Sequence, residues 1–240
     1  MYIPKIMEVN DFAKQAEIIN EYPLGILFNY AAPHGGLMSY LSGEQGEKKA
    51  DGEMCATHVP FLLVEGQDGK HKLIAHLAGE NQHIEMLKKS PNCMVVFQSA
   101  NSYVTPAWYP QKKQTHKFVP TWDFACVHVY GKAKIIQDEE WLLQMLNSLT
   151  DQQEAKRPEG DEFEKKWKVE ETDEKYLGGL MKRIVGLEIE ITDIQSKFKL
   201  HQGAAPVNVN GVLKGYESEK KDDNAKTMCK LTRESYPRDL

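Results

Sequence analysis

The stretches that decide most about this chain are SYVTPAWYP at residues 102–110 and VPTW at 119–122. Both are strand-like runs broken by proline, which lacks an N–H and is therefore confined to sheet edges, bulges and strand ends. Such places leave backbone polar groups free for a ligand, and tryptophan and tyrosine add flat apolar rings with one polar tip. The two stretches fit the rim of a site for a planar, partly polar molecule. They fit equally well a proline-broken edge strand whose aromatic residues lie in the core.

Outside these stretches the chain alternates in the manner of short strands. Strands are predicted over residues 24–30, 54–65, 71–77, 93–98, 121–136, 184–194 and 196–200. Helices are predicted over residues 11–21, 81–89, 138–155 and 173–183. Residues 31–53, rich in glycine, serine and charge, are expected to be a long loop. This order favours a mainly β fold, an antiparallel barrel with peripheral helices, over a parallel βαβ sheet.

The composition limits the class of protein. The chain has 240 residues, 41% of them apolar, and a net charge of −5, which argues against a dedicated nucleic-acid binder without excluding one. The four cysteines form no CxxC pair, and three lie in apolar runs, so buried free thiols in a reducing compartment are expected. No signal peptide or membrane span is evident. The prediction is a cytoplasmic protein, with a nuclear location left open.

The composition also changes along the chain. From about residue 203 the sequence becomes polar, and residues 217–224 are almost wholly charged. We therefore expect one domain over residues 1–202 and a C-terminal polar extension over 203–240 that is partly helical or mobile.

Histidines near a predicted helix start offer an anion seat. His76 and His83 flank HLAGENQH at residues 76–83, and Thr57 and His58 lie on a neighbouring strand. Free N–H groups at a helix start, with a hydroxyl and imidazole N–H groups, suit a phosphate. The plainer alternative is that His83 lies on a solvated helix face and His76 is a half-buried strand residue.

Other chemistries lack their patterns. The chain has no GxSxG nucleophile elbow, no HExxH zinc motif and no GxGxxG or P-loop. No metal site is predicted, and catalytic residues stay unassigned. What remains is a pocket for a planar anion, with an aromatic rim and a polar anion seat. Flavin mononucleotide (FMN) fits that description, and in such a site the cofactor supplies the chemistry.

Several sequence blocks, in order, resemble one family. They are MYIP at residues 1–4, ATHVPF at 56–61, HLAGENQH at 76–83, YVTPAWYP at 103–110, VPTWDFACVH at 119–128, LTD at 149–151, IVGLEI at 184–189 and KFKLHQ at 197–202. The chain resembles the PaiB-like FMN-binding split-barrel proteins, which are described as transcriptional regulators of protease synthesis and sporulation. The resemblance implies a six-stranded antiparallel split β-barrel. It also implies a homodimer with an FMN site at or near the shared interface.

The resemblance also suggests roles for residues. Four are assigned to the phosphate and ribityl chain: Thr57, His58, His76 and Asn81. Five are assigned to the ring: Tyr103, Thr105, Pro106, Trp108 and Trp122. Three further partners, which the other subunit could supply, are His128, Lys199 and Gln202. Oxidoreductase activity is one implied function. The alternatives are transcriptional regulation through partners or DNA, and haem binding or breakdown with His76, His128 or His201 as iron ligand.

The chain departs from the family pattern in three places. The loop at residues 35–53 is longer than expected, Asp123 stands where the family usually has Asn, and Gly203 stands where it usually has Asn. The two substitutions leave the hydrogen bonds around Asp123 and Gly203 open at this stage.

Overall fold

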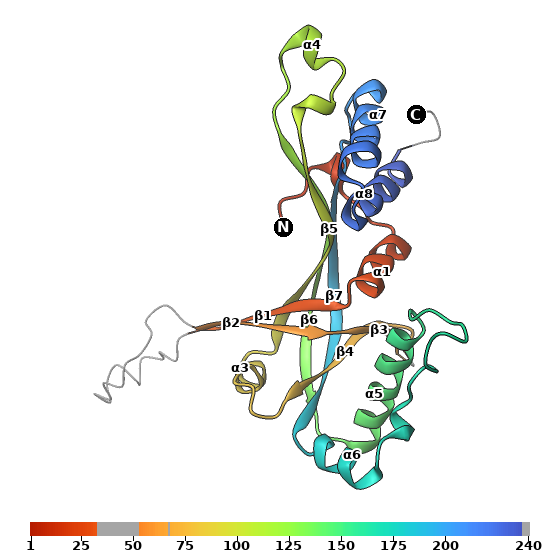
Figure 1. The fold of residues 1–240 in the computed structure, drawn as a ribbon. Coiled ribbons are helices and arrows are strands. Elements are labelled where there is room, and N and C mark those ends of the chain that lie inside the picture. Colours follow the sequence, from red (N-terminus) through yellow and green to blue (C-terminus); the bar gives the residue numbers. More distant parts are fainter. Residues whose placement is uncertain (33–52, 67, 237–240) are drawn as a thin grey trace, which may run out of the picture. The chain divides into compact units, whose positions relative to one another are not determined.

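The computed structural model describes residues 1–32, 53–66 and 68–236. Its described strands form one antiparallel sheet (Figure 1). They are β1 (Leu24–Ala31), β2 (Glu53–Pro60), β3 (Leu62–Glu65), β4 (His71–Ala78), β5 (Asn92–Val104), β6 (Thr121–Ile136) and β7 (Ile184–Lys199). The order in the sheet is β2-β1-β5-β6-β7-β4-β3. The predicted loop at 31–53 lies mostly outside the described residues.

The described strands number seven, whereas the family resemblance implied six. The predicted run 54–65 is two strands, and the two predicted strands 184–194 and 196–200 form the single strand β7. Phe61 separates β2 from β3. Its N–H leaves the ladder and donates to the Pro23 carbonyl (2.8 Å), and its side chain is only 1% exposed. β2 and β3, consecutive in the chain, thus lie at opposite ends of the strand order. A sheet whose two edges are joined through one residue must curl, which gives a barrel.

Helices and helical turns connect the strands. The α-helices are α1 (Phe12–Glu21), α3 (His83–Lys89), α4 (Lys112–Thr115), α5 (Glu139–Glu154), α6 (Glu174–Met181), α7 (Pro206–Gly215) and α8 (Asp223–Glu234). Shorter turns are η1 (Lys5–Met7), η2 (Pro106–Trp108), η3 (Val169–Glu171) and the π-helical η4 (Tyr216–Lys220). Aspartate N-caps begin four helices, each accepting a bond from a first-turn backbone N–H: Asp11, Asp138, Asp173 and Asp222. Among the described residues no helix is both long and apolar enough to cross a bilayer.

The chain divides into two compact units, and the three long strands β5, β6 and β7 contribute to both. Unit 1 comprises residues 1–22, 97–128 and 195–240, and unit 2 comprises 23–96 and 129–194. The predicted division at residue 202 stays a prediction. The residues beyond it form α7, η4 and α8 and belong to unit 1.

The core of unit 2 is the curled part of the sheet. β4 pairs with β7 from Lys72↔Glu190 to Ala78↔Ile184, and Leu73, Leu187 and Ile189 are fully buried. Gly131 lies where β6 meets β7. A Cβ there would come closer than 3.0 Å to the Glu190 carbonyl oxygen, so only glycine permits this approach.

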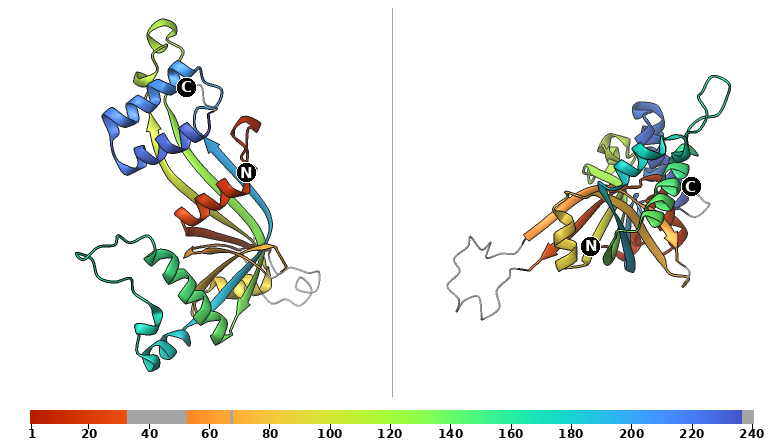
Figure 2. Two further views of the ribbon diagram at one scale, coloured as in Figure 1. Left: turned by 90° about the vertical axis from the view of Figure 1, so that its right-hand side faces the viewer. Right: turned by 90° about the horizontal axis from the view of Figure 1, so that it is seen from below.

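Unit 1 is a helix-covered sheet. The helices α1, α7 and α8 all lie on one face of its strands, as both the front and side views show (Figures 1 and 2). Between these helices and the strands lies the core of unit 1, in which four side chains are fully buried: Val209, Val212, Tyr216 and Met228. The polar C-terminal sequence therefore conceals two helices, each with one apolar face.

Candidate functional site

The residues predicted for the cofactor fall into two groups, one in each unit. Unit 2 holds Thr57, His58, His76 and Asn81. Unit 1 holds Tyr103, Thr105, Pro106, Trp108, Trp122, His128, Lys199 and Gln202.

A threonine and a histidine meet in unit 2. Thr57 Oγ1 on β2 lies 2.8 Å from His83 Nδ1 at the start of α3. His83 is fully buried, so the alternative that it lies on a solvated helix face is wrong. Burial lowers the pKa of His83, because a charged imidazole would lose its hydration. Its Nε2 has no partner among the described residues, so a neutral ring nitrogen is left for another group.

Asn81 organises the turn before α3. Its Oδ1 accepts the His83 N–H at 2.9 Å, and its backbone carbonyl accepts the Ile84 N–H at 3.0 Å. These two N–H groups are therefore occupied, although the sequence suggested that the helix start would offer them to a phosphate. In the structure Asn81 positions His83.

His58 and His76 differ from the Thr57–His83 pair in their burial and in their hydrogen bonds. Thr57 and His58 are consecutive in β2, so their side chains leave opposite faces, and only His58 is exposed. His76 on β4 is half-buried, burial lowers its pKa, and its Nδ1 lacks a partner in the described part of the chain. Two neutral imidazoles, those of His76 and His83, thus each hold an unused nitrogen.

An aromatic pair stands on the open face of unit 1. The rings of Tyr103 and Trp122 meet edge to face, with centroids 5.9 Å apart, and are 40% and 51% exposed. Trp122 Nε1 donates to Asn101 Oδ1 at 2.8 Å, which holds the indole in one orientation. This face is opposite the one that α1, α7 and α8 cover. Two predicted ring contacts therefore lie together on an accessible surface.

The other three predicted ring contacts form the turn after β5. Thr105 Oγ1 caps η2 by accepting the Ala107 N–H at 3.2 Å, and Pro106 is the first residue of that turn. Trp108, which ends it, is only 7% exposed and packs edge to face on Tyr216 at 5.2 Å. The structure therefore separates Trp108, beneath α7, from the exposed Trp122.

Lys199 and Gln202 already have partners within the chain. Lys199 Nζ donates to the Trp122 carbonyl at 2.6 Å and to Thr121 Oγ1. Gln202 bonds the Leu200 N–H and the Phe198 carbonyl. Burial lowers the pKa of Lys199, an effect that the charge of Asp123 opposes. His128 is half-buried, and burial followed by the N-terminal charge lowers its pKa. The predicted flavin contacts of these three residues stay predictions.

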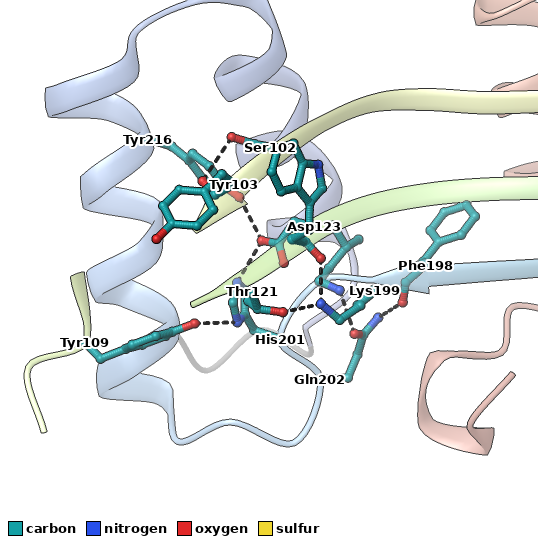
Figure 3. A network of polar contacts seen from close by, with 12 residues as sticks. Ser102, Tyr103, Tyr109, Thr121, Asp123, Phe198, Lys199, His201, Gln202 and Tyr216 are labelled. Atoms are coloured by element: carbon teal, nitrogen blue, oxygen red, sulfur yellow. Dashed lines mark hydrogen bonds and ion pairs between the residues drawn. The ribbon is translucent and has the colours of Figure 1, made fainter. Parts of the chain in front are cut away.

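A buried polar network lies behind the open face (Figure 3). The fully buried Asp123 accepts a hydrogen bond from the Tyr216 hydroxyl (2.8 Å) through Oδ2, and His201 Nε2 lies 2.7 Å from the same oxygen. His201 Nδ1 is 3.5 Å from the Tyr109 hydroxyl. Burial and the Asp123 charge raise the pKa of Tyr109 to about 12 and that of Tyr216 further. From the sequence, His201 was expected only as a candidate iron ligand, and Asp123 was noted only as a departure from the family pattern; that they meet Tyr109 and Tyr216 was not predicted.

One buried and two half-buried histidines predict instability in mild acid. Their pKa values are lowered from 6.5 by burial: His76, His83 and His128. The unfolded chain takes up their protons at a higher pH than the folded chain, so this contribution to stability is full well above pH 6.5 and is lost as the pH drops through 6.5 toward the folded pKa values. We expect the free energy of unfolding from urea titrations to fall between about pH 7.5 and 5.5. His83→Gln should flatten that slope, and an equal slope in both proteins would contradict the assignment.

Comparison with known proteins also indicates a flavin-binding protein. Residues 1–193 match the family described as "Putative FMN-binding domain". The chain belongs to this family. Its relatives include the Saccharomyces cerevisiae protein YKL070W, 50% identical over 167 residues that make up 69% of this chain and 98% of the relative. The Bacillus subtilis protease synthase and sporulation protein PAI 2 is 27% identical over 231 residues, 96% of each chain. The predicted PaiB-like resemblance is confirmed.

A solved structure has a similar fold. The FAD and heme binding protein from Mycobacterium smegmatis superposes with a TM-score of 0.52 at 12% identity, over 85% of this chain and 79% of that one. The predicted split-barrel class is confirmed, with seven described strands in place of six. Membership of an FMN-binding domain family makes the chain a flavin-binding protein.

Proposed function

We propose that this chain binds FMN and is an FMN-dependent oxidoreductase. The observation that carries the proposal is the match of residues 1–193 to an FMN-binding domain family. When bound, FMN supplies the one- and two-electron chemistry that side chains lack. What the protein's own residues contribute is binding, orientation and shielding from water. Each unit supports this separately.

Unit 1 supports ring binding. Tyr103 and Trp122 offer apolar ring surface on an open face, and the bond from Trp122 to Asn101 holds the indole ready without a ligand. A preset ring loses little conformational freedom on binding. Lys199, held at the Trp122 carbonyl, places a cation beside this pair.

Unit 2 supports phosphate binding by neutral donors. When the Thr57 hydroxyl donates to His83 Nδ1, the His83 proton is on Nε2. The unused nitrogens of His76 and His83 are then groups that a phosphate oxygen can accept from. Because burial lowers the pKa of both histidines, each ring is neutral at pH 7 and carries one N–H. A ligand oxygen would supply the partner that these nitrogens lack among the described residues.

Flavin binding is tested directly by retention. Protein incubated with FMN and desalted should keep the visible absorbance of flavin, with quenched fluorescence. Trp122→Ala should weaken FMN binding about tenfold to a hundredfold, because an aromatic contact worth about 1–3 kcal/mol is lost. Trp122→Phe should restore most of it, and Trp167→Ala, which removes another exposed indole (42%), should have no effect.

Riboflavin serves as the control ligand, because it lacks the phosphate. Riboflavin should bind more weakly than FMN if the neutral donors of unit 2 hold a phosphate. Loss of all flavin on desalting, with affinity only in the millimolar range, would contradict the proposal. Oxidation of a reduced nicotinamide nucleotide by the FMN-loaded protein is the assay for oxidoreductase activity.

We also propose a homodimer in which a second copy covers the apolar outer face of β1 and β2. Leu24, Tyr30 and Met54 are 61%, 48% and 76% exposed there, and Tyr30 lies directly opposite Met54 in the ladder. Exposed apolar residues gathered on one face mark an interaction surface. The resemblance to a dimeric family supports the same partner.

Charge on this face should separate the copies. Light scattering should give a mass of about 55 kDa for the wild type, twice the 27.4 kDa of one chain. Met54→Glu should lower it to the mass of one chain, because a carboxylate cannot be buried without a partner. Phe163→Glu, at another exposed aromatic (43%), is the control and should leave the dimer intact. A monomeric wild type would overturn the proposal.

The two alternatives have less support. A regulatory role is the association that the name of PAI 2 carries for that protein, and here the net charge of −5 favours a protein partner over direct DNA contact. Specific retardation of genomic fragments in a low-salt gel shift would reverse that preference. For haem, His201 already directs its ring nitrogens at Asp123 and Tyr109.

A further inference from the structure

The C-terminal residues 203–236, called the strap here, cover one tryptophan closely. Trp108 fits against two glycines of α7: a Cβ on Gly215 would come closer than 3.0 Å to the indole, and one on Gly211 closer than 3.0 Å to the Trp108 carbonyl. Asn208 at the start of α7 also bonds Gln111, two residues after Tyr109. The strap therefore has a surface shaped for the turn that carries Trp108.

The cover leaves polar atoms unsatisfied. Trp108 Nε1 is buried and has no acceptor among the described residues. Asp123 Oδ1 and Thr232 Oγ1 in the same unit are also buried without a partner in the described chain. A buried donor without an acceptor costs free energy, so each such group calls for an explanation. A state in which the strap is lifted gives the Trp108 N–H access to an acceptor.

The chain entering the strap has the geometry of a hinge. His201 and Gly203 both have left-handed backbone, with φ of 66° and 82°, and Lys221 between η4 and α8 has φ of 56°. For His201 and Lys221 this conformation is strained, because L side chains rarely adopt it. The π-helical η4 is a further irregularity of a kind frequent at functional sites. The left-handed residues therefore lie just before α7 and between η4 and α8.

One buried carboxylate fastens the strap. Asp123 Oδ2 on β6 accepts from Tyr216 of η4 and faces His201 at the hinge. The Tyr236 hydroxyl, just after α8, donates to the His201 carbonyl, and Lys220 Nζ bonds Ser102 Oγ on β5 at 2.6 Å. These bonds join the middle of the strap to β5 and β6 and its C-terminal end to His201, so the contacts of Asp123 must break when the strap opens.

We propose that the strap opens from the sheet as one unit, that Asp123 holds it closed, and that opening exposes Trp108 as a binding residue. The exposed indole would offer a ring face and an N–H donor to a planar ligand bearing a hydrogen-bond acceptor. Apolar burial of Val209, Val212 and Met228 keeps the closed state dominant, so the open state is a minor one. This inference does not rest on FMN binding.

Hydrogen exchange followed by NMR on the full chain, without flavin, tests the strap. The amides of residues 209–216 and the Trp108 indole N–H should show one common exchange rate once each rate is divided by the intrinsic rate of that group. That corrected rate should be about tenfold or more above that of the Leu73 and Leu187 amides in the core of unit 2. Tyr216→Phe should raise the common rate about tenfold again, because it removes one bond to the buried carboxylate. It should leave Leu73 and Leu187 unchanged.

Two further variants keep the test decisive. Lys230→Ala removes the ion pair between the strap and Glu17, whose partners are 58% and 40% exposed, together with a 3.9 Å pair to Glu234 within the strap. Because these pairs are exposed, the rate should change less than about twofold. If Tyr216→Phe does not fold, Tyr236→Phe takes its place. Exchange of the Trp108 indole at the rate of Leu73 and Leu187 in every variant would overturn the proposal. So would faster strap amides with an unchanged indole, because Trp108 would then not be uncovered.

Discussion

Gly215→Ala should detach the C-terminal helices from unit 1. The added Cβ would lie closer than 3.0 Å to three atoms of the buried Trp108 indole, which the turn η2 holds in place. Overpacking of this kind costs about 1–3 kcal/mol and occasionally more. We expect a loss of about 3 kcal/mol in the free energy of unfolding from urea titrations. The tryptophan emission should shift to the red as Trp108 meets water.

The matched control is a glycine in an open position. Gly178, also in a helix, has nothing within 4 Å of an added Cβ, so Gly178→Ala should stabilise the protein by about 0.5–1 kcal/mol through helix propensity. If Gly215→Ala were as stable as Gly178→Ala, the close fit of Trp108 against α7 would be wrong.

Phe61→Ala should destabilise the barrel by about 3–5 kcal/mol, the range for removal of a buried aromatic side chain. Phe61 is 1% exposed and is the single residue between the two edge strands β2 and β3. Natural domains are stable by only about 5–15 kcal/mol, so this one change removes a large part of the margin. Urea denaturation followed by circular dichroism measures the loss.

Phe163→Ala provides the comparison, because that side chain is 43% exposed and should lose less than about 1 kcal/mol. Equal losses in the two variants would show that the strand break at Phe61 is not a core position.

The strands were largely predictable, because apolar residues alternate with period two. The prediction of 121–136 coincides with β6, and that of 71–77 falls one residue short of β4. The break at Phe61 was not predictable, since the alternation continues through Pro60 and Phe61. Only the ladder, in which the Phe61 N–H turns to the Pro23 carbonyl, shows that two strands are present.

The strap was predicted only as a polar extension that is partly helical or mobile, because residues 217–224 are almost wholly charged. Charge at a helix junction says little about the helices on either side. α8 buries Met228 and Leu231 on one face while Lys226 and Lys230 stay outside. A helix this polar on average is found by the spacing of its apolar residues rather than by its composition.

The site was predictable in its residue types and less so in its geometry. Tyr103 and Trp122 lie together as expected, whereas Trp108, six residues after Ser102, lies beneath α7. Asp123 could have been noticed, because it is a charged residue at an inward position of an alternating strand. Its partners Tyr216 and His201 are 93 and 78 residues away along the chain, and only folding shows that they meet.

The register of β4 has a consequence for folding during synthesis on the ribosome. β4 can pair with β3 at once, but Lys72 pairs with Glu190, so the other edge of β4 stays unpaired until β7 has left the ribosome. At about 5–20 residues per second, the four earliest strands wait several seconds with an unpaired edge. Chaperone demand in the cell should therefore peak when roughly three quarters of the polypeptide has been made, and a translational pause placed before β7 would be more damaging than one placed after it.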